Sequence, residues 1–318
     1  MVYRKRALKI AVFVLGLAIL LLVVSLIFVP KNRKDKSKFW KEEAAATGIL
    51  GERENSIDVL VLGDSESYSS IIPMELWKKT GFSSYVCGTS AQRLKYTKTL
   101  LQRAYLNQKP KVVILETNAI FRKGTKTQAA YENICNIFSV FQYHNRWKSF
   151  EWKDFSKGPR FTWTDDYKGY IYSNRIRSGS GEEYMEPTDE VAAIPEQNAE
   201  YVKEIKQYCE ERGARFILWS TPSSKNWNYG RHNAVSELAE ELGCEYVDLN
   251  LQNDVVQIDW KEDTRDKGDH VNHSGAVKVT DYLAGYLKGL GILADHSKEK
   301  DYRKWNEALV RYELIVEK

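Results

Sequence analysis

Ser65 follows directly after a run of apolar residues and is the first candidate for chemistry in this sequence. The run at residues 57–62 is almost entirely aliphatic, and it ends at Gly63-Asp64-Ser65. A continuous apolar run of this length is typical of a parallel strand covered on both faces. Open α/β sheets place their sites at the carboxyl ends of such strands. Ser65 is therefore a candidate nucleophile, which needs a base to remove its proton and a carboxylate to orient that base.

The sequence around Ser65 is similar to a known family. Gly63-Asp64-Ser65 resembles the first motif of the SGNH, or GDSL-type, hydrolase superfamily. The longer stretch from Gly-Asp-Ser-Glu to Gly88-Thr-Ser-Ala-Gln resembles its DltD-like, membrane-anchored bacterial branch. The resemblance covers roughly residues 57–290, with the serine first and the histidine last, as in the superfamily.

The resemblance implies roles for four residues. Ser65 would be the nucleophile and His270 the general base. The oxyanion hole would be formed by Ser65, the backbone N–H of Gly88 and the side-chain amide of Asn118. This chain departs from the family in two places: Asn118 stands in Glu-Thr-Asn-Ala where Gly-x-Asn-Asp is usual, and Lys267 stands where an aspartate usually precedes the histidine by three residues.

Two aspartates could orient His270. Asp266 lies four residues before it, and Asp269 directly precedes it. A turn that folds back brings a carboxylate to the Nδ1–H group more easily from a separation of three or four residues than from one. The sequence therefore favours Asp266 and leaves Asp269 open. Asp269, His270 and His273 are also metal-binding residue types, but the sequence offers no fourth ligand, so we expect no metal and no cofactor.

The elements that must position these residues follow a strand–helix rhythm. Strands are predicted at residues 57–62, 84–87, 111–117, 215–220 and 246–249, with helices between them and after the histidine motif. Three successive strands end near Ser65, Gly88 and Asn118, which is the convergence that an oxyanion site requires. The predicted fold is a three-layer α/β/α sandwich of the flavodoxin-like kind, with a five-stranded parallel sheet.

Residues 119–194 interrupt this rhythm. They are rich in aromatic residues interleaved with polar ones, and a segment of this length between strands is usually functional. Aromatic faces beside polar groups could stack on sugar rings or line an acyl channel. Trp147, Trp163 and Tyr167 are therefore predicted to bind an acceptor. A small subdomain core is the alternative that the composition leaves open.

The first residues predict a membrane anchor. Residues 10–29 carry no charge, and at about 1.5 Å per residue they match the roughly 30 Å hydrocarbon core. A cleaved signal peptide is the alternative, but the run exceeds the roughly 7–15 apolar residues of a signal sequence and no small-x-small cleavage site follows it. A short tail before the span and a long domain after it favour a single-pass protein with its domain outside the cytoplasm.

The charge distribution argues against nucleic acid as a partner. Of 47 Lys/Arg and 43 Asp/Glu, residues 1–38 hold nine and one, which leaves 38 against 42 in a mildly acidic remainder. The four cysteines show no CxxC pairing and are expected to be free. His144, His232 and His296 have no partner pattern and are predicted to lie at the surface.

Four parts of the chain are predicted. They are a membrane anchor with its basic flank at residues 1–31, a juxtamembrane linker at 32–56, a catalytic domain at 57–294 that contains the aromatic insertion, and a charged helical tail at 295–318.

The resemblance implies acyl transfer through a Ser65 acyl-enzyme. DltD-like proteins serve O-acylation at the cell surface, commonly beside a membrane-bound O-acyltransferase, so a glycopolymer or a lipid-linked hydroxyl is the implied acceptor. An extracytoplasmic carbohydrate or lipid esterase, or deacetylase, uses the same residues and is the alternative. A non-catalytic glycan-binding partner of the acyltransferase ranks third, because it would be marked by a lost triad and this chain retains both Ser65 and His270.

Overall fold

The computed structural model describes residues 2–28, 45–124, 126–150, 152–155, 164–182 and 184–317. The chain divides into two compact units. The first unit consists of Met1–Lys38 and Gly124–Trp163, and the second consists of Phe39–Lys123 and Thr164–Lys318. The middle of the predicted insertion therefore belongs with the N-terminal helix. Trp163 and most of the predicted linker lie outside the described residues.

The second unit is built on one parallel sheet. Its strands are β1 (Val59–Gly63), β2 (Ser84–Gly88), β3 (Val112–Glu116), β4 (Arg215–Ser220) and β5 (Glu245–Asp248). Neighbouring strands are parallel in the order β2-β1-β3-β4-β5. Every residue of β1, β2 and β3 is buried, which explains why these strands appear as apolar runs without alternation. The predicted five-stranded parallel sheet is confirmed.

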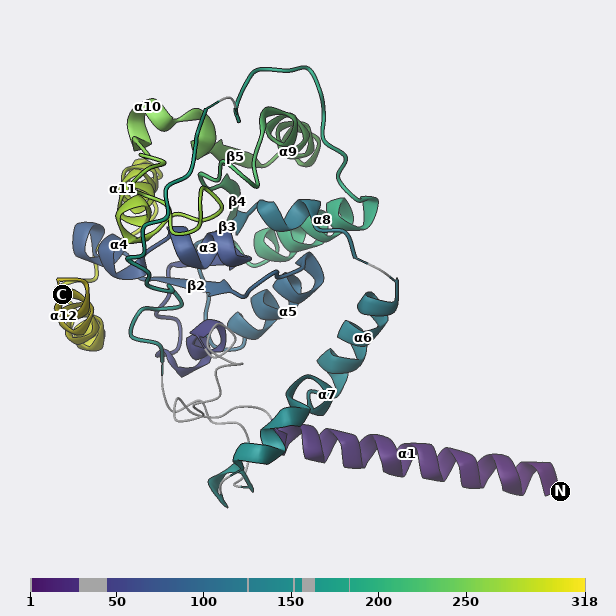
Figure 1. Cartoon of the computed structure of the whole chain (residues 1–318). Helices are drawn as coiled ribbons and strands as arrows, with labels where there is room; N and C mark the ends of the chain where they lie inside the picture. The colour runs from purple at the N-terminus through teal and green to yellow at the C-terminus, as the bar shows by residue number, and fades with distance from the viewer. Residues whose placement is uncertain are drawn as a thin grey trace. The chain divides into compact units, whose positions relative to one another are not determined.

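Helices cover both faces of this sheet (Figure 1). One face carries α5 (Leu94–Ala104), α8 (Glu196–Glu210) and α9 (Tyr229–Leu242). The other carries α4 (Pro73–Thr80) and α11 (His273–Gly289). The fold is thus the three-layer α/β/α sandwich that the sequence predicts.

The charged C-terminal tail also packs on the second unit. Its helix α12 (Arg303–Val316) contacts α4, and the Trp305 and Trp77 rings lie 5.0 Å apart. All four cysteines lie within the described residues, and none of them forms a disulfide. The short elements of this unit are η2 (Gly48–Gly51), α3 (Ser65–Ser70), η3 (Asn118–Phe121), η6 (Leu249–Leu251), α10 (Asn253–Val256) and η7 (Lys300–Tyr302).

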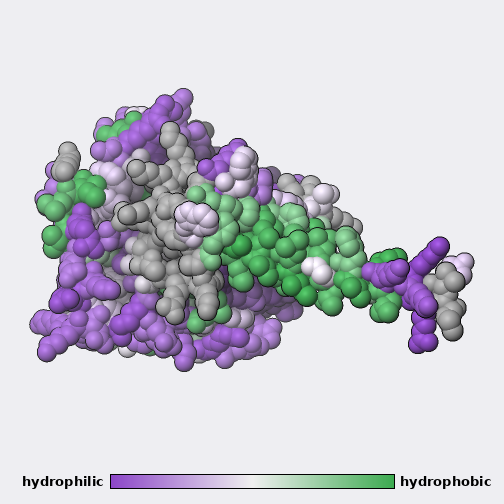
Figure 2. Space-filling view, turned by 90° about the horizontal axis from the view of Figure 1, so that it is seen from below, coloured by the Kyte–Doolittle hydropathy of each residue, from purple (hydrophilic) through white to green (hydrophobic). Residues whose placement is uncertain are grey.

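The first unit is helical. It contains α1 (Val2–Phe28), α6 (Lys126–Ile137), α7 (Val140–Tyr143), η4 (His144–Ser149) and η5 (Trp152–Phe155). Within the described residues, α1 is the one helix long and apolar enough to cross a membrane; its mean hydropathy is 3.2, and only 6% of the most apolar stretch is buried. Figure 2 shows it as a continuous hydrophobic surface that ends in hydrophilic residues.

Candidate active site

Ser65 lies at the carboxyl end of β1, where the chain turns from the sheet into α3. Asp64 caps this short helix, because its Oδ1 accepts a hydrogen bond from the backbone N–H of Glu66 at 3.0 Å. At the end of the neighbouring strand, a Cβ at Gly88 would lie 2.4 Å from Ser67 Oγ. Glycine is therefore required at the end of β2 for the first turn of α3 to pack there, and Ser65 and Gly88 end adjacent strands at the same edge.

His270 lies in the loop between α10 and α11, and Asp266 holds it in place. Asp266 Oδ2 is 2.6 Å from His270 Nδ1, and Asp266 Oδ1 accepts the backbone N–H of His270 at 2.7 Å. The turn between them contains Lys267 at φ 70° and Gly268 at φ 92°. Asp269 is farther away, with its Oδ2 3.7 Å from Nδ1. Of the two candidate aspartates, the structure thus places Asp266 on the imidazole.

The other ring nitrogen of His270 is the chemically informative one. Because Nδ1 faces the Asp266 carboxylate, it carries the proton in the neutral ring, and Nε2 presents a lone pair. Nε2 is buried and has no hydrogen-bond partner among the described residues. Ser65 Oγ is accordingly not hydrogen-bonded to it in this structure. A buried acceptor without a partner is costly, so Nε2 is suited to receive a hydroxyl proton.

Glu66, the residue after the serine, brings α3 next to the histidine loop. One oxygen of Glu66, one of Asp269 and one ring nitrogen of His270 all lie within 4.8 Å of one another. Asn226, in the loop after β4, joins the two carboxyl groups: its Nδ2 donates to Glu66 Oε1 at 2.9 Å and to Asp269 Oδ1. Sequence reasoning missed Asn226, although the rule that sites collect at strand ends also applies to this loop.

The donor set at this cluster does not favour a metal. His273, one of the three residues considered as ligands, begins α11 and its Nδ1 is hydrogen-bonded to Tyr170. The Asn226 amide directs N–H groups at the carboxyl oxygens that a cation would need. Asp266 already engages His270 Nδ1. The contacts are those of a hydrogen-bonded network.

Asn118 begins η3 just after β3, and both ends of its amide have partners. Nδ2 donates to Asp64 Oδ2 at 3.0 Å, and Oδ1 accepts from Arg231 Nη1 at 3.2 Å. A donor on one side and an acceptor on the other fix which way the amide faces. The amide nitrogen carries two hydrogens, and Asp64 accepts one of them. Arg122 also binds Asp64, with its Nε 2.7 Å from Oδ2.

Two buried carboxyl groups lie at the same strand ends. Glu66 is 2% exposed and Glu116, the last residue of β3, is 1% exposed. Burial raises the pKa of each well above its ordinary value; the Asp64 charge adds to this shift at Glu116. Both groups therefore hold a proton more strongly than an ordinary glutamate does. In the same layer the Asp64 carboxylate is paired with Arg122.

The pKa of His270 is set by opposing effects. Burial lowers it, but the Asp266 hydrogen bond and then the Glu66 carboxyl group raise it, and the net pKa lies above the ordinary histidine value. The same contact acts on the partner: burial raises the pKa of Asp266, but the His270 hydrogen bonds outweigh it and the net pKa is lowered. The pair thus favours an ionised Asp266 beside a histidine that is more basic than usual.

This pair predicts the acid limb of the pH–rate profile. Only neutral His270 can take a proton, so kcat/KM for ester cleavage should fall as the pH drops through the raised pKa of His270, with a midpoint above about 6.5. A pH titration of kcat/KM measures it. Glu66→Gln is the control, because a limb that persists in this variant belongs to His270. A midpoint at or below the ordinary value would contradict the assigned environment.

The three predicted acceptor residues are not brought together in the described structure. Trp147 belongs to the first unit, where 62% of it is exposed. Tyr167 belongs to the second unit and packs edge-on against Tyr312, with ring centroids 6.0 Å apart. Trp163 lies outside the described residues. Their role in acceptor binding stays a prediction.

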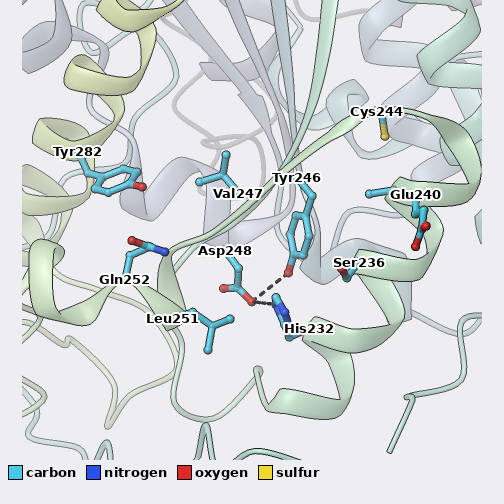
Figure 3. Close-up of a pocket in the computed structure, with 11 residues that line it drawn as sticks. His232, Ser236, Glu240, Cys244, Tyr246, Val247, Asp248, Leu251, Gln252 and Tyr282 are labelled. Carbon is cyan, nitrogen blue, oxygen red and sulfur yellow. Dashed lines mark hydrogen bonds and ion pairs between the residues drawn. The ribbon is translucent and has the colours of Figure 1, made fainter. Parts of the chain in front are cut away.

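A separate pocket of about 500 Å³ lies beside β5 and α9 (Figure 3). Within it Asp248 Oδ2 accepts hydrogen bonds from His232 Nδ1 at 2.9 Å and from Tyr246 OH at 3.0 Å. Asp248 Oδ1 accepts hydrogen bonds from the backbone N–H and the side-chain amide of Asn250. His232 and His296, which the sequence predicts at the surface, are only partly exposed in the structure. Each has a carboxylate partner, and His296 Nε2 lies 2.8 Å from an Asp58 oxygen. Both pairs are structural contacts that the sequence spacing did not indicate.

Comparisons with known proteins give fold similarity only. No family model and no curated protein matches the sequence. Among solved structures, the chain is similar to the lipase/acylhydrolase from Enterococcus faecalis, with a TM-score of 0.41 and 9% identity over 75% of this chain and 98% of that one. It is also similar to a GDSL-like lipase from Bacteroides thetaiotaomicron VPI-5482, with a TM-score of 0.42 and 10% identity over 80% of this chain and 100% of that one. At these scores the similarity assigns no activity to this chain.

Proposed function

We propose that this chain is an SGNH-type serine enzyme that carries an acyl group on Ser65 and serves the O-acylation of a cell-surface glycopolymer or lipid-linked hydroxyl. The supporting observation is the state of His270. Its Nδ1 is held by Asp266, and its buried Nε2 has no partner among the described residues. One of its ring nitrogens lies within 4.8 Å of an oxygen of Glu66, in the helix that Ser65 begins. This is the arrangement that activates a serine hydroxyl.

In the proposed first half-reaction, Ser65 Oγ bonds to the carbonyl carbon of the acyl donor while His270 Nε2 takes the hydroxyl proton. The carbonyl electrons move to oxygen, where the N–H groups of Ser65 and Gly88 and the second amide hydrogen of Asn118 would stabilise the charge. The tetrahedral intermediate then expels the donor alkoxide, which takes the proton from Nε2. The acyl group remains on Ser65.

The second half-reaction decides between a transferase and an esterase. An acceptor hydroxyl, or water, gives its proton to Nε2 and attacks the acyl carbon, and Ser65 leaves with that proton. An acceptor competes with abundant water only if it is bound and oriented, which can supply several kcal/mol. We propose that α1 anchors the domain outside the cytoplasm. Anchoring would raise the effective concentration of surface acceptors and of a membrane-bound O-acyltransferase partner.

The deciding experiment follows the acyl group after Ser65 has been loaded from a synthetic ester. When glycopolymer is present, we expect more of the labelled acyl group to be transferred to the polymer than to be released by water. Trp147→Ala and Trp163→Ala should reduce that share while leaving the loading step intact, and Tyr131→Ala, an exposed aromatic residue of the first unit, is the matched control. Release to water alone under every condition would leave an extracytoplasmic esterase as the function. Failure to load Ser65 at all would leave the non-catalytic glycan-binding partner.

A further inference from the structure

The last turn of α1 is built into the first unit. Arg146 is 1% exposed, and its Nη1 donates to the backbone carbonyls of Ile27 at 3.2 Å and Phe28 at 2.9 Å. The N–H of Val140 donates to Ser25 Oγ at 3.1 Å. The final carbonyls of a helix have no partner within it, so Arg146 supplies donors that the end of α1 requires.

These contacts indicate that α1 is retained in the mature protein. Removal of α1 as a signal peptide would take away both carbonyls that Arg146 binds and leave a buried guanidinium to be solvated again. It would also expose the face of Phe150 that packs against Phe28 at 4.7 Å. A leader destined for cleavage gains nothing from such contacts with a segment more than a hundred residues later.

The length of α1 fixes the depth of its C-terminal end in a bilayer. From Ile10, the first residue after Lys9, to Phe28 the helix rises about 28 Å, close to the roughly 30 Å of hydrocarbon. If Lys9 stays in one headgroup region, Phe28 reaches the opposite boundary. The segments that contact this part of the unit, α7, η4 and η5, must then lie at or near that boundary.

A chain of aromatic rings extends outward from Phe28. Phe150 packs on Phe28, Phe155 lies 5.8 Å from Phe150, and Trp152 lies 6.1 Å from Phe155. The outer rings are open to solvent: Trp152 is 92% exposed and Phe155 is 56% exposed. Trp147, with Lys148 5.7 Å from its ring centroid, is exposed as well. Exposed tryptophan beside basic side chains is typical of the protein surface that lies at a membrane–water interface.

We infer that Trp147, Trp152 and Phe155, here called the aromatic collar, insert into the lipid headgroup region around the outer end of α1. The collar rests on the proposal that α1 spans the membrane, and it does not depend on catalysis by Ser65. It fixes the tilt and depth of α1, and it would place Trp147 where a lipid-linked hydroxyl is presented.

Depth-dependent fluorescence quenching tests the collar. The full-length protein carries an environment-sensitive fluorescent amino acid at position 152, or at position 19 in the exposed middle of α1, in vesicles of phosphatidylethanolamine and phosphatidylglycerol. Quenchers are attached either near the headgroup or near the bilayer centre. At position 152 we expect emission to fall about twofold or more with the shallow quencher and less with the deep one, and the reverse at position 19.

Each other outcome overturns the inference in a distinguishable way. Quenching at position 19 without quenching at position 152 would support α1 as a membrane anchor and refute the aromatic collar. A mass of the intact protein that shows α1 to be missing would refute both the anchor and the collar. Iodide, a quencher dissolved in the water, gives a further outcome. If it quenches the fluorophore at position 152 in pure lipid vesicles but not in native membranes, this surface binds a protein partner and not lipid. Ser65→Ala should leave every one of these signals unchanged, so failure of the catalytic proposal is read separately.

Discussion

Replacement of Ser65 by alanine should lower kcat/KM for a short acyl ester by about 10³-fold or more, because the covalent step has no substitute nucleophile. The side chain is half-buried at the start of α3, and the cap on this helix comes from Asp64, so the helix should still form. The measurement is steady-state hydrolysis, combined with circular dichroism to confirm folding.

Ser236→Ala is the matched control for this variant. Ser236 is exposed on α9 and lies in the separate pocket, so its loss should leave hydrolysis unchanged. Full turnover in Ser65→Ala would refute the assignment of the nucleophile, whatever the state of His270. Loss of the folded signal in Ser65→Ala would require Ser65→Cys, in which covalent labelling of the thiol reports whether His270 still activates this position.

The second large effect is expected at Asp266. Asp266→Asn should lower kcat by about 10³- to 10⁴-fold, because an amide facing Nδ1 favours the imidazole tautomer that carries its proton on Nε2. Asp269→Asn should cost less than about tenfold, since its oxygen is 3.7 Å from Nδ1 and its main partner is the Asn226 amide. Steady-state kinetics of both variants at one pH above the acid limb gives the comparison.

The two aspartate variants are controls for each other, because they remove the same charge within one loop. A larger loss in Asp269→Asn would transfer the orienting role to that residue. Equal small losses would show that neither aspartate is needed to orient His270. The acid limb gives an independent check: Asp266→Asn should move its midpoint to lower pH, because the hydrogen bond that raises the pKa of His270 is gone.

The sheet could be predicted because burial on both faces leaves a plain signal in the sequence. The strands β1 to β3 are buried at every position, so each appears as an apolar run that ends in a polar or small residue. The separation of four residues from His270 also favoured Asp266, the aspartate that the structure places on Nδ1, and Gly268 helps to make the turn that this spacing needs. The role of Asp266 in catalysis stays a prediction.

Other parts of the site could not be predicted, because they depend on contacts between distant loops. A glutamate after the serine is by type a surface residue, yet Glu66 is 2% exposed, and burial raises its pKa well above the ordinary value. Arg231 reaches Asn118 from the first turn of α9, a position without any local motif. Composition likewise could not show that Trp147 belongs to the unit of α1.

The position of His270 after all five strands has a consequence for biosynthesis. A nascent chain that has emerged as far as β5 contains the whole sheet and the Ser65 helix, but neither Asp266 nor His270. If Ser65 is the nucleophile that we propose, it has no base until the segment leading into α11 has been made. On the same proposal, a chain truncated after β5 would contain Ser65 without Asp266 or His270, so premature termination would yield no active product.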